Sequence, residues 1–266
     1  MTEPLSLPVF RKISRIVDGM GLRAYVIGGY VRDYYLCRPC TDIDVVVVGS
    51  GIDVAEALAR ETGSNVTVFK TNRIKNIINA LKWCPYNKIM IIIQLSPTFH
   101  IIHSRKPVVE AGTLRDDQLR RDFTINALAW SLNGDTFGEL EDPFGGMEDM
   151  REHIIRTPCD PDITFSDDPL RMMRAVRFAA QLGFDIAPET FEAIERNRER
   201  IRIVSRERII TEINKIVLSP VPSIGFELMD MTGLLPLVFP EMSRLKGVEK
   251  VGLHGHKDNF THTLKV

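Results

Sequence analysis

The runs Ala24–Asp33 (AYVIGGYVRD) and Thr41–Val48 (TDIDVVVV) decide the predicted fold of this chain. The apolar stretch in each run predicts a β-strand, and the paired glycines after the first strand predict a turn into a helix that begins near Tyr30. Side chains alternate faces along a strand, so Asp42 and Asp44 are expected to point the same way. The two runs therefore predict a strand–helix–strand unit that carries two neighbouring carboxylates.

This carboxylate pair is a candidate metal site. Asp42 and Asp44 together can hold one or two Mg²⁺ ions, which prefer oxygen ligands, and such a site clamps the oxygens of a phosphoryl or nucleotidyl transfer. A loop edge with solvated charges is the plain alternative. The upstream residues favour the metal site, because Gly28 and Gly29 let backbone N–H groups approach an anion closely. Arg32 adds a positive charge suited to phosphate, and the following helix aims its positive end at the same place.

Composition sets broad limits on the protein. Its 266 residues are 44% hydrophobic and 26% charged, which is a globular composition sufficient for one large domain or two ordinary ones. The net charge of −1 does not indicate a nucleic-acid partner, so any such surface must come from local clusters. No signal peptide and no membrane span are expected. The four cysteines suit a reducing cytoplasm, and we interpret Cys37 and Cys40 as reduced loop thiols rather than a metal or redox pair.

The chain changes character at about residue 150. Before it, strands are expected at 25–27, 45–48, 66–69 and 89–94, and helices at 52–61 and 120–132, which is an α/β pattern. After it the strands vanish, and helices are expected from Pro169 to Gly183, from Pro188 to Arg198, from Ser205 to Ser219, and over 224–231. The second half is therefore predicted to be an all-helical unit.

Two further groups of polar residues lie outside the first unit. Arg121, Asp122 and Asn126 suit a triphosphate and its sugar, although ordinary first-turn charges of a helix explain them as well. The run Asp167–Phe178 places Arg171, Arg174 and Arg177 three residues apart, so they form a basic stripe on one helix face. A solvated stripe, with Asp168 as a helix cap, is the ordinary reading. In the functional reading, Asp168 and Arg171 read the edge of a base.

The window Thr62–Val109 contains no aspartate or glutamate, although the chain has 35 acidic residues, and it contains seven lysines or arginines. One interpretation is a basic strip for nucleic acid. The plainer one is that this piece does not share the selection history of its flanks. We hypothesise that roughly 72–103 is an out-of-frame or otherwise scrambled stretch, which resequencing of the gene would settle.

Taken together, these motifs resemble the bacterial tRNA nucleotidyltransferase and poly(A) polymerase family, the class II CCA-adding enzymes. The matching runs stand in family order: Gly28–Asp33, Asp42–Asp44, Arg120–Leu128, Asp142–Asp149, Asp167–Arg171 and Ser205–Ile209. The resemblance implies a polymerase-β-like nucleotidyltransferase head with a mixed sheet, followed by an all-helical neck domain. The implied divisions are a catalytic head over 1–150, a neck that binds nucleotide and RNA over 151–245, and the start of a truncated HD-like or body domain over 246–266.

The resemblance also implies an activity and its residues. Asp42 and Asp44 match Mg²⁺ ligands, and Gly28, Gly29 and Arg32 match the triphosphate motif. Arg121 matches a nucleotide-binding arginine, with Asp122 near the ribose. Asp168 and Arg171 match an amino-acid template for CTP and ATP, and Arg174 and Arg177 match further nucleotide contacts. The implied reaction builds C-C-A on the 3′ end of tRNA, with CTP and ATP as substrates and no nucleic-acid template.

Two departures from the family bear on activity. Members usually carry a third acidic residue on a strand in the region 70–100, where this chain offers none. The chain also stops where an HD-type domain begins in some members, so we expect a truncated gene or protein with weakened tRNA binding. Three functions therefore stay open: a CCA-adding enzyme, which is the leading hypothesis, a poly(A) polymerase with the same head and neck, and an inactive nucleotide- or RNA-binding remnant.

Overall fold

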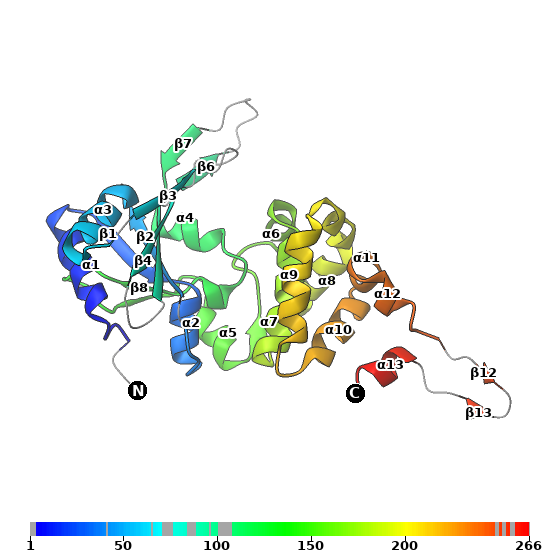
Figure 1. Cartoon of the computed structure of the whole chain (residues 1–266). Coiled ribbons are helices and arrows are strands. Elements are labelled where there is room, and N and C mark those ends of the chain that lie inside the picture. The colour runs from blue at the N-terminus through cyan, green and yellow to red at the C-terminus, as the bar shows by residue number, and fades with distance from the viewer. Residues whose placement is uncertain are drawn as a thin grey trace. The chain divides into compact units, whose positions relative to one another are not determined.

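The computed structural model describes residues 4–40, 42–64, 66–70, 77–83, 89–95, 97–100, 108–247, 250–251, 254–255 and 259–265. The chain divides into two compact units, Met1–Met147 and Glu148–Val266, and each is described by itself (Figure 1). The predicted division into parts at 150 and 245 stays a prediction.

Unit 1 is built on a seven-stranded mixed sheet with the strand order β3-β4-β5-β2-β1-β8-β9. Neighbouring strands run antiparallel, apart from β2 and β5, which run parallel. The strands are β1 (Arg23–Ile27), β2 (Asp42–Val48), β3 (Val66–Lys70), β4 (Ile77–Trp83), β5 (Ile89–Leu95), β8 (Ala129–Ser131) and β9 (Leu140–Glu141). The strands β6 (Pro97–His100) and β7 (Val108–Ala111) pair antiparallel in a separate two-stranded sheet.

Helices cover the two faces of this sheet differently. The helices α1 (Pro8–Gly19) and α3 (Gly51–Thr62) pack on each other and on the strands, against a face that includes the buried Val26 and Val45. The short helix α2 (Gly29–Tyr35) links β1 to β2 and rests its tyrosines on Trp130, with ring centroids 4.9 Å apart for Tyr34. On the other face, α4 (Leu114–Leu119) packs Leu114 against a small buried cluster of Ile27, Val46 and Ala129.

Most of the elements expected in the first half are confirmed. The four predicted strands correspond to β1, β2, β3 and β5, and the helix expected at 52–61 corresponds to α3. The helix expected at 120–132 is wrong. After α4 ends at Leu119, the chain forms a 3₁₀ turn over Thr124–Asn126 and then the strand β8, which pairs with β1. All residues from Asp122 to Asn133 are buried, polar and apolar alike, so this segment has no exposed face whose period would tell helix from strand.

Unit 2 is mainly helical, as expected. Its helices are α6 (Pro161–Asp167), α7 (Leu170–Leu182), α8 (Pro188–Asn197), α9 (Arg206–Val217), α10 (Pro222–Met231), α11 (Leu235–Val238), α12 (Pro240–Ser243) and α13 (Asn259–Thr263), and α5 (Gly146–Arg151) precedes them at the boundary. Two short strand pairs, β10 (Ile154–Ile155) with β11 (Asp185–Ile186) and β12 (Lys250–Val251) with β13 (His254–Gly255), were not expected.

The core of unit 2 forms where α7 packs against α9 and α10. The apolar face predicted for α7 is buried, with Met173 and Val176 fully covered. Gly225 of α10 allows a close approach, because a methyl group there would lie 2.4 Å from Cγ2 of Ile216. Among the residues that the structure describes, no helix is both long and apolar enough to cross a membrane.

Candidate functional site

The two aspartates of the metal prediction lie on one face of the sheet, where β2 begins. Asp42 is exposed and Asp44 is half-buried, whereas Ile43 between them is buried on the other face. Asp44 pairs with Ile27, the last residue of β1, so the carboxylates lie beside the turn that follows this strand. The strand–helix–strand unit thus brings the predicted glycines and aspartates together.

The turn at Gly28 is closely approached by two charged side chains. Gly28 has a φ of +84°, and a methyl group on it would lie 2.7 Å from Nη1 of Arg121 and 3.6 Å from Oδ2 of Asp44. The backbone N–H of Gly28 donates to the carbonyl of Leu128 at 3.1 Å, which ties the turn to the segment that carries Arg121. A cation and a carboxylate therefore meet at a backbone turn that only glycine forms easily.

The environment of Asp44 changes its acidity. Burial raises the pKa of the Asp44 carboxyl, and the negative charges of Asp42 and Asp117 raise it further, whereas the Arg121 guanidinium lowers it. The net shift is upward from the ordinary value of 3.8. Folding thus holds Asp44 in a place where its negative charge is costly, which is typical of sites that bind cations or reacting groups.

Asp117 is an acidic residue of this site that the sequence reasoning did not single out. Its side chain is buried, and Oδ2 accepts a hydrogen bond from Nε of Arg121 at 3.1 Å. Oδ1 accepts another from Arg120 at 3.3 Å. The spacing of four residues between Asp117, near the end of α4, and Arg121, just after it, is a signal that could have found this pair. Asp117 orients Arg121 toward the turn.

A chain of buried hydrogen bonds joins Arg32 to Asp122. Nη1 of Arg32 donates to Oδ1 of Asn126 at 2.7 Å, and Nδ2 of Asn126 donates to Oδ1 of Asp122 at 2.9 Å. Asp33 accepts from two nitrogens of Arg32 at 2.8 and 2.7 Å. Unit 1 therefore brings together all of its predicted site residues: Gly28, Gly29, Arg32, Asp42, Asp44, Arg121 and Asp122.

These residues fit a magnesium ion. Mg²⁺ is commonly bound through one or two carboxylates, with substrate phosphates and water completing its shell, and Asp42 and Asp44 are hard oxygen donors on one face. Within the described part of the chain, no group of three or more His, Cys, Asp or Glu side chains could hold a metal by itself.

The strand beside the aspartates carries no acid. The parallel pairing of β2 with β5 places Met90 at the register position of Asp42 and Ile92 at that of Asp44. The strands β4 and β5 fall within the stretch 72–103 of the scrambling hypothesis, while 72–76, 84–88, 96 and 101–103 lie outside the described residues. The hypothesis itself stays a prediction, and a third carboxylate from this stretch is ruled out by the sequence alone.

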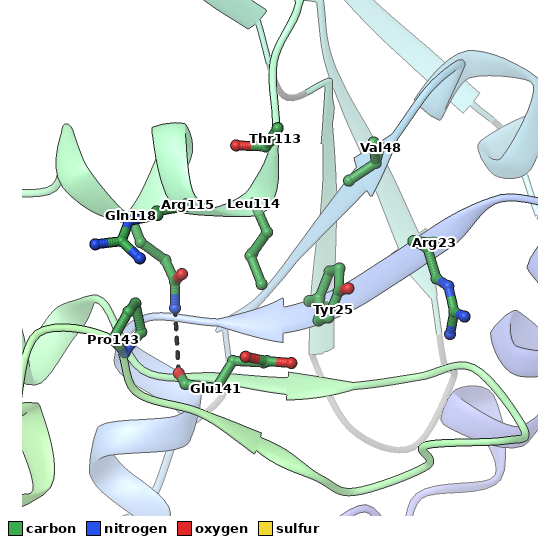
Figure 2. A pocket seen from close by; sticks show the side chains of 9 residues that line it. All are labelled: Arg23, Tyr25, Val48, Thr113, Leu114, Arg115, Gln118, Glu141 and Pro143. Carbon is green, nitrogen blue, oxygen red and sulfur yellow. Dashed lines mark hydrogen bonds between the residues drawn. The ribbon is translucent and has the colours of Figure 1, made fainter.

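A cavity of about 400 Å³ lies on the same face of the sheet, farther along the strands (Figure 2). Tyr25 and Val48 line its floor, and α4 contributes Leu114 and Gln118, whose amide donates to the carbonyl of Glu141 at 3.1 Å. Along β2, Val46 lies between Val48 of this cavity and Asp44, and Ile27 and Ala129 lie at the register position of Asp44. None of the predicted site residues lines it.

In unit 2 the predicted base-reading residues lie at the start of α7. Oδ1 of Asp168 accepts from the backbone N–H of Leu170 at 3.1 Å, in the first turn of α7, whose N-cap position is Pro169 and not Asp168. Its Oδ2 forms an ion pair with Arg208 of α9 at 2.7 Å. Arg171 is half-buried and donates to the carbonyl of Thr164 at 3.3 Å.

The arginines of the predicted stripe on α7 differ in their burial and in their contacts. Arg174 is half-buried, with its guanidinium carbon 5.5 Å from the ring centroid of Phe178. Arg177 is buried and forms an ion pair with Glu212 of α9 at 2.7 Å. This last arginine therefore serves the packing of two helices, whatever else it contacts.

The cysteine pair precedes the aspartates. Cys37 and Cys40 are free thiols, and the Sγ of Cys40 donates to the backbone carbonyl of Asp42 at 3.3 Å. Burial raises the pKa of the Cys40 thiol, which keeps it protonated and unreactive. Cys84 lies outside the described residues.

Two family models match the chain. The "Poly A polymerase head domain" matches residues 24–156, and the "Probable RNA and SrmB- binding site of polymerase A" matches residues 183–246. The first model spans every site residue of unit 1. Asp168, Arg171, Arg174 and Arg177 lie between the two models, in a stretch that neither spans.

Relatives of this chain point to the same family. The CCA-adding enzyme of Anoxybacillus flavithermus is 33% identical over 89% of this chain and 57% of its own length. The CC-adding tRNA nucleotidyltransferase of Halalkalibacterium halodurans is 34% identical over 82% of this chain and 50% of its own length. A crystal structure of a tRNA nucleotidyltransferase with a primer tRNA and an incoming ATP analogue superposes with a TM-score of 0.72 and 31% identity, over 88% of this chain and 66% of that one. The chain thus spans about half the length of these curated relatives.

Proposed function

Because the chain belongs to the family of class II CCA-adding tRNA nucleotidyltransferases and poly(A) polymerases, we propose that it transfers CMP and AMP from CTP and ATP to the 3′ end of tRNA. The observation that supports this most is the meeting of Asp44 and Arg121 at the Gly28 turn. Arg121, a cation suited to phosphate, and Asp44, a carboxylate suited to a metal ion, come from two separate segments and approach this turn.

The proposed reaction is an attack of the tRNA 3′-hydroxyl on the α-phosphate of the nucleotide. The hydroxyl oxygen loses its proton to water and forms a bond to the α-phosphorus. The bond from this phosphorus to the oxygen that bridges to the β-phosphate breaks, and pyrophosphate leaves. Asp42 and Asp44 would hold Mg²⁺, which when bound neutralises charge on the phosphates and on the attacking and leaving oxygens. Arg32 and Arg121 would bind the triphosphate, since guanidinium groups match phosphate oxygens, and Gly28 and Gly29 would give it close access to the backbone.

Two further roles concern the nucleoside part of the substrate. We propose that Asp122, which lies next to Arg121 in the sequence and is buried, faces the ribose. We also propose that Asp168 and Arg171 supply the acceptor and donor that distinguish the bases, with Arg174 as a further contact. Oδ2 of Asp168 forms an ion pair with Arg208 of α9, which supports a defined orientation of this carboxylate.

A single assay separates the possible products. The protein is incubated with Mg²⁺, one labelled nucleotide at a time, and a tRNA that lacks its terminal CCA. Incorporation of two C residues and one A, then arrest, supports the proposal, whereas long A tracts indicate a poly(A) polymerase. Two C residues alone indicate an activity like that named for the Halalkalibacterium relative. Asp42→Ala should abolish every product and leave the fold intact, because Asp42 is exposed.

A second candidate function is a nucleotide- or RNA-binding protein without turnover. The observation that favours it is the absence of any acidic residue between Thr62 and Val109, with Met90 and Ile92 at the register positions beside the aspartates. This candidate predicts that CTP and ATP bind while no labelled product appears at any Mg²⁺ concentration.

A further inference from the structure

The side chain of Asn126 lies between two residues of the proposed nucleotide site. It is 5% exposed, and its amide touches both neighbours at short range. Oδ1 accepts from Nη1 of Arg32 at 2.7 Å, and Nδ2 donates to Oδ1 of Asp122 at 2.9 Å. The amide is thus occupied by protein groups on both sides.

The chemistry of the two neighbours fixes how this amide is oriented. A guanidinium only donates hydrogen bonds, and an ionised carboxylate only accepts them. Asn126 therefore turns its oxygen to Arg32 and its nitrogen to Asp122, and the reverse orientation would leave both contacts repulsive. Among residues of this size, aspartate offers no donor to Asp122 and leucine offers a partner to neither residue.

Other contacts hold the three residues from outside. Asp33 accepts from two nitrogens of Arg32, and the backbone N–H of Phe123 donates to Oδ1 of Asp122 at 3.0 Å. The backbone of Asn126 closes a 3₁₀ turn by donating to the carbonyl of Phe123 at 3.0 Å. Each of the three residues is also held by a hydrogen bond to a group outside the network. The network therefore sets the spacing between Arg32 and Asp122.

We propose that Asn126 is a positioning residue that couples the phosphate subsite to the sugar subsite through Arg32 and Asp122. The inference rests on the proposed function, in which Arg32 binds the triphosphate and Asp122 faces the ribose. Asn126 itself does not contact the nucleotide. It makes the two subsites act as one rigid unit, which favours a ribonucleotide over a molecule that fills only one of them.

The test compares Asn126→Asp with a matched control, Asn133→Asp. Asn133 is also buried, and its Nδ2 donates to a carboxylate oxygen of Asp18 at 2.9 Å while its Oδ1 accepts from the backbone N–H of Ala24 at 3.1 Å. Both variants therefore replace an amide by a carboxylate that faces another carboxylate. Only Asn126 lies in the proposed nucleotide site, so a loss that comes from folding alone should be shared by both.

The readouts are the melting temperature and the equilibrium affinities for CTP, dCTP and inorganic tripolyphosphate, with Mg²⁺ present. Asn126→Asp should weaken CTP binding by roughly ten- to hundredfold, the range of a lost hydrogen bond to a charged group. In this variant the ratio of the CTP affinity to the dCTP affinity should fall toward one. Tripolyphosphate binding should change by less than about threefold, because the new carboxylate still accepts from Arg32. Asn133→Asp should keep the wild-type preference.

A second variant guards against a failure of Asn126→Asp to fold. Asn126→Ala adds no charge, and it should weaken both CTP and tripolyphosphate binding because both neighbours lose a partner. The inference is overturned if Asn126→Ala binds all three ligands as the wild type does, or if Asn126→Asp and Asn133→Asp show the same CTP to dCTP ratio. A wild-type protein that binds none of the three ligands overturns the proposed function, and the coupling with it.

Discussion

The half-buried negative charge of Asp44 lowers the stability of the folded chain. Burial raises the pKa of its carboxyl, so the folded chain binds this proton more tightly than the unfolded chain does. Between the ordinary value of 3.8 and the raised pKa, unfolding releases a proton. Stability therefore falls as the pH rises through this window, and the penalty remains in full at neutral pH. Functional residues often carry such a cost.

Replacing this charge should stabilise the protein. Asp44→Asn is expected to raise the free energy of unfolding at pH 7 without divalent cations, because the amide carries no charge to desolvate. The gain should shrink as the pH falls through the raised pKa of Asp44. Urea unfolding of both proteins in EDTA, at several pH values, measures this gain in the free energy of unfolding. Mg²⁺ should stabilise the wild type and not the variant. A variant that is less stable than the wild type at pH 7 contradicts this account.

Substitution of Gly28 should disturb both the backbone turn and Arg121. Gly28→Ala places a methyl group 2.7 Å from Arg121 on a backbone with a φ of +84°, so the arginine must move and the turn is strained. We expect a loss of about 1–3 kcal/mol in the free energy of unfolding, together with weaker CTP binding. Urea unfolding and calorimetric titration measure the two effects.

A matched control separates strain from contact at this turn. Gly21 has a φ of +65° and open space around it, so Gly21→Ala strains the backbone without touching the site. It should lower stability and leave CTP affinity unchanged. If Gly28→Ala binds CTP as tightly as Gly21→Ala does, Arg121 has no part in nucleotide binding at this turn.

Elements whose apolar residues repeat with a clear helical or strand spacing could be predicted from the sequence. Elements that are buried on every side could not. The helix α3 has one apolar face, and α7 ends at Gly183 with a left-handed φ of +69°, so both were predicted closely. The sequence predicts a helix across the 3₁₀ turn Thr124–Asn126 and β8, and this prediction is wrong because the residues are buried on every side. The error also hid the role of Asn126, which depends on that 3₁₀ turn rather than on a helix surface.

Site residues could likewise be predicted where they share a local sequence pattern, and not where the fold brings them together. The aspartates of β2 and the Gly28 turn come from one local unit, so spacing alone could group them. Asp117 is also local, since it lies four residues from Arg121. The contact of Asn126 with Arg32 instead joins two segments far apart in the chain, and no period in the sequence marks it. Burial of Arg177 was also hidden, because a three-residue spacing predicts a stripe but does not tell which helix packs over its end.

This ion pair supports a prediction about helices α7 and α9. The Nε of Arg177 lies 2.7 Å from Oε2 of Glu212, and the two side chains are only 10% and 4% exposed. Glu212→Gln leaves the arginine buried without its counter-charge and should cost about 3–5 kcal/mol in the free energy of unfolding. The double variant Arg177→Met with Glu212→Leu should lose much less, because no charge is left buried. Urea unfolding of the single and double variants tests this.

The same double variant also tests whether Arg177 touches the nucleotide. If it folds and binds CTP with wild-type affinity, Arg177 serves only to join the helices. A drop of tenfold or more in CTP affinity, without a matching loss of stability, would instead return Arg177 to the nucleotide contacts that the family resemblance implies. Arg174→Met is the comparison, since Arg174 lies one turn earlier and is half-buried.

For the whole molecule, the distribution of charge matters more than its sum. A net charge of −1 gives no general attraction to RNA. The short run 196–208 nevertheless carries six arginines against two glutamates, and all six arginines are exposed. It spans the end of α8, the 3₁₀ helix Arg198–Ile203 and the start of α9, inside the region that matches the RNA-binding family model. RNA phosphates are the partners that such a cluster suits.

Salt dependence tests this surface quantitatively. Each phosphate contact contributes about 0.7–0.9 to the slope of log affinity against log salt. A triple variant with Arg200, Arg202 and Arg206 changed to glutamine should therefore reduce the slope for tRNA binding by about 2–3. The control changes Lys12, Arg15 and Arg60 to glutamine on the helices of unit 1, which removes equal charge from a surface outside the cluster. If both triple variants lower the slope equally, tRNA responds to overall charge and the arginine cluster is not its docking surface. A lower slope in the cluster variant alone shows that local charge, in a chain with almost no net charge, is enough to bring RNA to the helical unit.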